Sequence, residues 1–257
     1  MGTIISNNTS SGVISTPDYW SPGFDLTGCV YAGLFNLPEL TTNLAPVTSG
    51  VTQLGTTVRD GVFPRFKAGT FQLNTGLTVG SKASTFIAVY KKIDALGMGS
   101  FNRCFLVSSY VGSGEGGASL VLEGGGAAGP NPPNVTVYRV LQSLGQNTQS
   151  AAGGNTPSSD GWSISVARSW NDPDTGNCKV RIYNALNGGS SSGTATTPMG
   201  NSTNFISIGG TPSSSSTSTQ EVTMASALVF NRALEDSELP AIVSYYRRYL
   251  KRFNINV

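Results

Sequence analysis

Residues 162–170, WSISVARSW, alternate large and small side chains, and this alternation constrains the fold more than any other feature of the chain. Successive residues of a β-strand point to opposite faces of the sheet. The small residues therefore share one face, and the other face carries Trp162, Ile164, Val166, Arg168 and Trp170. A face of small residues lets a second layer approach closely, or it lines a shallow concave surface. The pattern predicts a strand here.

The same period of two recurs in short segments along the chain. These segments are TFIAVYK (85–91), RCFLVS (103–108), ASLVLE (118–123), VTVYRVL (135–141), CKVRIYNAL (178–186), NFISIGG (204–210) and VTMASALVF (222–230). Glycine, proline, serine and asparagine fill the stretches between them, and these residues favour turns and loops. In residues 85–91 both alternating sets are largely apolar, which predicts a central strand covered on both faces.

The end of the chain changes to the period of a helix. Apolar residues recur there at steps of three and four, at Leu239, Ile242, Val243, Tyr246, Tyr249, Leu250 and Phe253. We expect a helix over residues 236–253 with Asp236 or Ser237 as its N-cap, because Pro240 is tolerated only in the first turn. Basic residues near the C-terminal end suit the helix dipole and form either a solvated face or a docking surface for an acidic partner.

The chain has 257 residues, and its length and composition indicate one main domain. We expect residues 51–257 to form it and residues 1–50 to form an N-terminal arm, because Pro38 and Pro46 discourage a continuous central strand. Charged residues make up 12% of the chain and the net charge is +2, so there is no basic field for nucleic acid. No apolar run suits a membrane span, and the first residues lack the pattern of a signal peptide.

The segment ASALVFNRALEDSEL (225–239) resembles the closing motif of the laminin G-like branch of the concanavalin A-like lectin/glucanase superfamily. Upstream, FKAGTFQL (66–73), WSISVARSW and FISIGG resemble other strands of that branch, so the resemblance covers residues 63–257. The branch commonly has serine where Glu235 stands, so the helix cap is expected to lie at a later residue. The resemblance implies an all-β, two-sheet antiparallel jelly-roll sandwich with one C-terminal helix. Such domains bind glycans, bind proteins or serve as structural modules of virions.

The polar residues lack the usual catalytic patterns. The chain contains no histidine, which removes the usual general base and the commonest metal ligand. The paired-carboxylate strand motif of the glucanases in the superfamily does not occur either. Glu235, Asp236 and Glu238 lie at the predicted helix start, where negative residues stabilise the dipole. We therefore expect a protein that is not an enzyme.

Two sets of residues are candidates for binding. Tyr110, Tyr138 and Trp170 are candidates for stacking against sugar rings, and the alternative is that they pack in the core or on a sheet. Asp172 and Asp174, in the segment NDPDTGN, have the oxygen spacing of a calcium loop, and the alternative is a plain hairpin turn. Calcium is the one possible cofactor. Three cysteines in no metal-ligand spacing, Cys29, Cys104 and Cys178, are expected to be reduced thiols.

These observations lead to one functional hypothesis and two alternatives. The hypothesis is a non-enzymatic structural protein of a tailed-bacteriophage virion: a lectin-like decoration, fibre or tail-associated subunit, made in the host cytoplasm. Its expected partners are other virion proteins, further copies of itself in an oligomer or array, and host surface glycans. The first alternative is a free or cell-surface carbohydrate-binding module. The weaker alternative is a glycan hydrolase.

Overall fold

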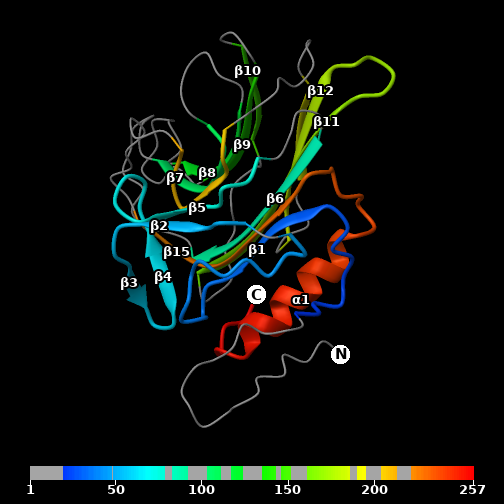
Figure 1. The fold of residues 1–257 in the computed structure, drawn as a ribbon. Helices are drawn as coiled ribbons and strands as arrows, with labels where there is room; N and C mark the ends of the chain where they lie inside the picture. Colours follow the sequence, from blue (N-terminus) through cyan, green and yellow to red (C-terminus); the bar gives the residue numbers. More distant parts are fainter. Residues whose placement is uncertain are drawn as a thin grey trace, which may run out of the picture.

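The computed structural model describes residues 20–47, 49–78, 83–91, 103–110, 117–123, 135–142, 146–151, 161–185, 190–194, 204–212 and 221–257. These residues form two antiparallel β-sheets and one C-terminal helix (Figure 1). The predicted all-β sandwich with a terminal helix is confirmed. No stretch of helix in these ranges is both long and apolar enough to cross a membrane.

The first sheet has eight strands. They are β1 (Cys29–Leu34), β3 (Val58–Asp60), β4 (Phe63–Phe66), β6 (Ala83–Lys91), β11 (Trp162–Asn171), β12 (Cys178–Asn184), β13 (Ser190–Thr194) and β15 (Val222–Phe230). Their order is β13-β12-β11-β6-β15-β4-β3, and β1 also pairs with β15. The first and last of these strands in the sequence are thus neighbours, with Cys29 opposite Phe230 and Leu34 opposite Ser226.

The second sheet has seven strands in the order β10-β9-β8-β7-β14-β5-β2. They are β2 (Thr52–Leu54), β5 (Gln72–Asn74), β7 (Arg103–Ser108), β8 (Gly117–Glu123), β9 (Val135–Gln142), β10 (Gln146–Ala151) and β14 (Ser207–Ile208). The strands predicted at residues 103–108, 118–123, 135–141 and 204–210 lie in this sheet, although the last contributes only two residues to a ladder.

The space between the sheets is filled by one apolar cluster. Phe86, Ala88 and Tyr90 of β6 enter it from the first sheet, and Leu106 of β7 and Leu120 of β8 enter it from the second. The small-residue face of β11 points into this space. Ser165 lies 3.1 Å from the Tyr90 hydroxyl, and Ser169 lies 3.0 Å from the Ser84 hydroxyl. Both bonds join β11 to its neighbour β6 within the first sheet. Close approach of a second layer, one of the two interpretations of this small-residue face, stays a prediction.

The outer face of the first sheet is covered by the helix α1 (Leu239–Lys251). In Figure 1 the helix, drawn in red, lies against the part of the sheet formed by β1, β15 and β6. Its buried stripe is Leu239, Ile242, Val243, Tyr246, Tyr249 and Leu250, which matches the predicted apolar positions. Within this second cluster, Ile87 and Val89 of β6 and Leu228 of β15 lie under the helix. The central strands are therefore covered on both faces, as predicted for residues 85–91.

Two sequence-based boundaries need correction. The helix begins at Leu239 with Glu238 as its N-cap residue, so neither Asp236 nor Ser237 is the cap. The carboxylate of Glu238 binds the Arg232 guanidinium at 2.6 and 2.8 Å and accepts the backbone N–H of Glu235 at 2.7 Å. It therefore fastens the turn before the helix and caps no N–H inside it. The helix also ends at Lys251, two residues before the predicted end.

The predicted arm of residues 1–50 contains a strand of the first sheet, and the division of the chain at residue 50 stays a prediction. β1, within that range, is a buried strand of the first sheet, and Pro38 and Pro46 do not interrupt it because it ends at Leu34. Asn43 then fastens the following segment. Its side-chain oxygen accepts the backbone N–H of Ala32 at 2.9 Å, and its amide donates to the carbonyl of Val30 at 3.1 Å. Residues 1–19 of the predicted arm lie outside the described residues.

Candidate functional site

The three aromatic residues proposed for sugar contact do not share one sheet. Trp170 lies near the end of β11 in the first sheet and is half-buried. Tyr110 follows β7 of the second sheet, and its backbone N–H donates to the Ser108 hydroxyl at 3.1 Å. Tyr138 lies in β9, opposite Leu120 and Ser150, but its side chain lies outside the described part of the structure. A shared sugar site made by these residues stays a prediction.

Asp172 and Asp174 lie in the turn between β11 and β12. The Asp172 carboxylate accepts the backbone N–H of Asp174 at 3.0 Å and forms an ion pair with Lys179. These contacts, the Lys179 hydrogen bond first, lower the pKa of the Asp172 carboxyl below its usual value. Among the described residues no group of three or more acidic or thiol side chains could hold a metal ion. The turn is a hairpin in which the Asp172 carboxylate bonds to the Asp174 backbone and to Lys179. Calcium binding there stays a prediction.

The three cysteines are free thiols, as expected, and all are buried. Burial raises the pKa of Cys29 to about 12 and that of Cys178 to about 11. A thiol with a raised pKa is a poor nucleophile at neutral pH, so neither group suits covalent chemistry.

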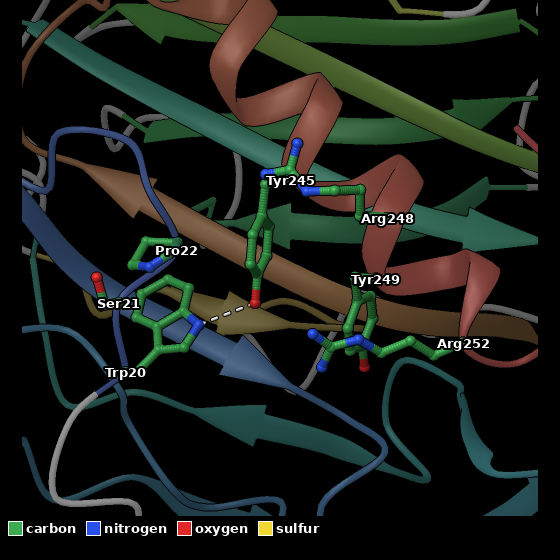
Figure 2. Close-up of a pocket in the computed structure, with 7 residues that line it drawn as sticks. All are labelled: Trp20, Ser21, Pro22, Tyr245, Arg248, Tyr249 and Arg252. Atoms are coloured by element: carbon green, nitrogen blue, oxygen red, sulfur yellow. Dashed lines mark hydrogen bonds between the residues drawn. The ribbon is translucent and has the colours of Figure 1, made fainter. Parts of the chain in front are cut away.

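A pocket lies where the segment before β1 meets the C-terminal half of α1 (Figure 2). Its cavity volume is about 20 Å³, so the pocket is small and a ligand would lie largely outside it. The lining residues are Trp20, Ser21, Pro22, Tyr245, Arg248, Tyr249 and Arg252. Tyr245, Arg248 and Tyr249 lie on α1, and Arg252 is its C-cap residue. Arg248 and Tyr249 follow Tyr245 by three and four positions, and Arg252 follows Arg248 by four, so all four lie on one side of the helix. The first three come from the other end of the described chain.

Three aromatic rings line this pocket. The rings of Trp20 and Tyr245 are 6.1 Å apart at 76°, and those of Tyr245 and Tyr249 are 6.3 Å apart and nearly parallel, at 8°. Phe24 packs against both rings of the first pair, with its ring centroid 6.0 Å from that of Trp20 and 5.6 Å from that of Tyr245. Such edge and offset contacts are favourable geometries for aromatic pairs. Packing among these rings therefore holds them in place without a ligand.

Hydrogen bonds fix the orientation of the rings. The Trp20 indole N–H donates to the Tyr245 hydroxyl at 2.9 Å, drawn as the dashed line in Figure 2. The Tyr249 hydroxyl donates to the side-chain oxygen of Asn36 at 2.6 Å. Burial raises the pKa of both tyrosines, and for Tyr245 the Trp20 hydrogen bond and the charges of Arg252 and Arg248 oppose this rise. Both phenols are therefore neutral at physiological pH.

The charges at the pocket are positive. Arg248 and Arg252 are exposed, and within the described part of the chain neither forms an ion pair. By contrast, Arg168, Arg181 and Arg232 are each bound to a carboxylate. The lining contains no acidic side chain and no thiol. The arrangement suits binding through rings and cations.

No family model matches the sequence, and no curated protein matches it. Among solved structures, the binding domain of botulinum neurotoxin serotype D is similar with a TM-score of 0.58 at 11% identity, over 85% of this chain and 51% of that chain. The binding domain of botulinum neurotoxin DC in complex with SialylT gives 0.52 at 11% identity, over 86% and 51%.

A structure of botulinum neurotoxin type C, whose cell entry is described as dependent upon interaction with two ganglioside molecules, gives a TM-score of 0.50 at 10% identity, over 85% of this chain and 51% of that chain. This chain thus spans about half the length of the structures that it matches. At these identities the likeness establishes a shared fold. The laminin G-like resemblance rests on the sequence motifs and stays a prediction.

Sequence reasoning missed this pocket. Trp20 lies in residues 1–50, which were predicted to be an arm. Tyr245 lies beside the apolar stripe of the helix and was not among the residues predicted for that stripe. One signal was available, because Tyr245, Arg248 and Arg252 follow one another at steps of three and four. An aromatic residue aligned with two cations on one side of a helix is a binding pattern as well as a solvated face. Nothing in the sequence indicated that Trp20 lies opposite them.

Proposed function

We propose that this chain is a non-catalytic glycan-binding β-sandwich and that the aromatic pocket at α1 contacts the sugar. The observation that carries the proposal is a pair of half-buried rings, Trp20 and Tyr245, held at the pocket by their own hydrogen bond and by packing on the buried Tyr249 ring. The C–H faces of a sugar stack on aromatic rings, and neighbouring polar groups bind its hydroxyls. Ser21 and the Tyr245 hydroxyl are polar groups within reach of such a ligand.

The fold comparison supports the same class of ligand. Two of the similar structures are described with a ganglioside or with SialylT. Those descriptions concern binding domains about twice the length of this chain, and fold alone does not carry a function from one protein to another. Glycan binding by this chain is therefore argued from its own pocket.

We further propose that the chain works as a subunit of a tailed-bacteriophage virion. The closing motif at residues 225–239 supports this through its resemblance to laminin G-like domains. Display of many copies on a particle raises the effective strength of a weak sugar site by roughly 10² to 10⁴. Mass spectrometry of purified particles whose genome encodes the chain tests the proposal. Absence of the chain from such particles would favour the free or cell-surface carbohydrate-binding module.

A second candidate function is contact with another virion protein. Leu54 of β2, Val58 of β3 and Val62 are 46%, 64% and 44% exposed. β2 and β3 are the terminal strands of the two sheets, and exposed apolar side chains at sheet edges are typical of protein contacts. This candidate predicts binding to a particle subunit that Val58→Lys abolishes and that Trp20→Ala leaves unchanged.

The test of glycan binding uses the purified chain, clustered on beads for avidity, against a panel of bacterial and animal surface glycans. Trp20→Ala is expected to reduce binding roughly tenfold or more, because stacking of this kind contributes about 1–3 kcal/mol. The matched control is Phe205→Ala, which removes an aromatic ring that is 55% exposed and outside the pocket. Equal loss in both variants, or no binding by the parent chain, would reject the proposal.

A further inference from the structure

We propose that the pocket selects a sugar residue that carries a carboxylate, so that the ligand is an acidic glycan. This inference rests on the proposed glycan-binding function and assigns its ligand class. Two structural features support it. The aromatic rings of the pocket can contact a sugar of any charge, whereas the two arginines beside them favour a sugar with a negative charge. Only an anionic ligand uses both features.

The two arginines are available for a ligand. Arg248 lies on α1 and Arg252, four residues later, is its C-cap residue, so both lie on the side that faces Trp20. Figure 2 shows their side chains extending from the helix beside the Tyr245 and Tyr249 rings. Among the described carboxylates, Asp60, Asp172, Glu221, Asp236 and Glu238 form ion pairs with other basic residues.

The same helix provides a comparison for these cations. Arg247 lies next to Arg248, but its guanidinium donates to the carbonyl of Ala185 at 3.2 Å, so it braces the helix on the loop after β12. Lys251 lies next to Arg252, is exposed, and does not line the pocket. The basic residues at this end of the helix therefore have different surroundings. Arg247 bonds to a carbonyl, Lys251 is solvated, and Arg248 and Arg252 line the pocket. Only the last two are placed to meet a bound sugar.

Guanidinium groups fit a carboxylate better than they fit a hydroxyl. A carboxylate accepts two parallel N–H bonds from one guanidinium, and such charge-assisted bonds are roughly twice as strong as neutral ones. Lysine supplies the charge without this planar fork. Because both arginines are exposed, salt screens their attraction, with a Debye length of about 8 Å at 0.15 M and 3 Å at 1 M. Selectivity for an acidic sugar should therefore be clear at low salt and weaker at high salt.

The test measures affinity for two pairs of probes by calorimetry or by competition against bead-bound ligand. One pair is an oligogalacturonate and the same oligomer with its carboxylates reduced to alcohols, and the other is sialyllactose and lactose. In at least one pair the acidic member should bind roughly tenfold tighter or more, since a hydrogen bond to a charged group contributes that much. The preference should shrink several-fold between about 0.05 and 0.5 M salt.

Variants then assign the preference to the pocket. Arg248→Gln and Arg252→Gln should each reduce the acidic preference several-fold, and Arg252→Lys should restore part of it. Lys251→Gln removes the same charge from the same helical turn outside the pocket, so it should leave the preference within about twofold. All three positions in this series are exposed, and a thermal melt of each variant checks that it folds.

The outcomes separate this inference from the proposed function. Equal binding of acidic and neutral members overturns the carboxylate preference while glycan binding stands. The same holds when neither pair binds but the wider panel yields a neutral ligand that Trp20→Ala removes. Silence of the whole panel rejects both. An acidic preference that Lys251→Gln reduces as strongly as Arg252→Gln comes from the overall charge of the helix, and it overturns the assignment to this pocket.

Discussion

Asp236 connects the turn before α1 to two strands of the first sheet, and its removal is the most informative test of stability. Its carboxylate binds the guanidinium of Arg168 on β11 and, at 2.7 Å, that of Arg181 on β12. The Arg168 side chain is only 6% exposed, whereas Asp236 is 61% exposed. Arg168 also donates to the carbonyl of Leu234, and its Nε has no hydrogen-bond partner among the described residues. Asp236→Ala therefore leaves a buried cation with one partner.

The expected cost follows from the burial of each group. A buried donor that loses its partner costs about 1–3 kcal/mol, and breaking a fully buried ion pair costs about 3–5 kcal/mol. Water reaches Asp236, so the lower range applies, and the bridge to the more exposed Arg181 adds little. We expect Asp236→Ala to reduce the free energy of unfolding by about 2 kcal/mol. For a domain of this size, that change lowers the melting temperature by roughly 4–8 °C.

The assay is urea unfolding followed by tryptophan fluorescence, with a double-mutant cycle. In an Arg168→Met background the buried charge is gone, so Asp236→Ala should cost only about 0.5 kcal/mol. Glu235→Ala is the control, because Glu235 is an exposed neighbour that forms no ion pair among the described residues. Additive effects of the two substitutions, or an equal loss from Glu235→Ala, would refute the account.

Three further predictions follow from other contacts. The hydrogen bond from Lys91 lowers the pKa of the Asp60 carboxyl in the folded chain. The ionised carboxylate therefore stabilises the fold fully above its unfolded pKa near 4, and this stabilisation is lost as the pH falls through the lower folded pKa. Asp60→Asn should make the urea midpoint depend less on pH between pH 2 and 5. Tyr246→Phe removes a buried 2.7 Å bond to Ser226 and should cost about 1 kcal/mol in the same assay, whereas no change would show that the bond contributes nothing. Because Lys179 already occupies the Asp172 carboxylate, calcium and a chelator should give the same melting temperature, and a rise with calcium would establish the metal site.

The sequence predicted best those elements whose local pattern reflects their surroundings. Residues 85–91 are apolar on both faces because β6 lies between the inter-sheet cluster and the helix. The small residues of β11 are buried as well, and Ser165 and Ser169 bond to Tyr90 and Ser84 of the neighbouring strand β6. The apolar stripe of α1 was predicted residue by residue for the same reason. In each case burial alone determines the periodicity.

Features that depend on distant partners were not predictable. β1 looked like part of an arm because its partner, β15, lies at the other end of the chain. The helix start was placed too early because Asp236 resembles a cap, but its carboxylate is used by Arg168 and Arg181. The pocket required knowing that Trp20 contacts Tyr245 across 225 residues. Local propensity contains no information on such pairings.

The position of β15 has a consequence for how the chain folds. This strand lies inside the first sheet, bonded to β6 along one edge and to β4 and β1 along the other, yet it is the last strand in the sequence. During synthesis β1, β4 and β6 emerge with open edges and no strand to join them. Closure must await residues 222–230, so folding is dominated by contacts between distant residues and belongs to the slow, millisecond-to-second class. A nascent chain of this protein therefore depends on protection of its edges until residues 222–230 have been synthesised.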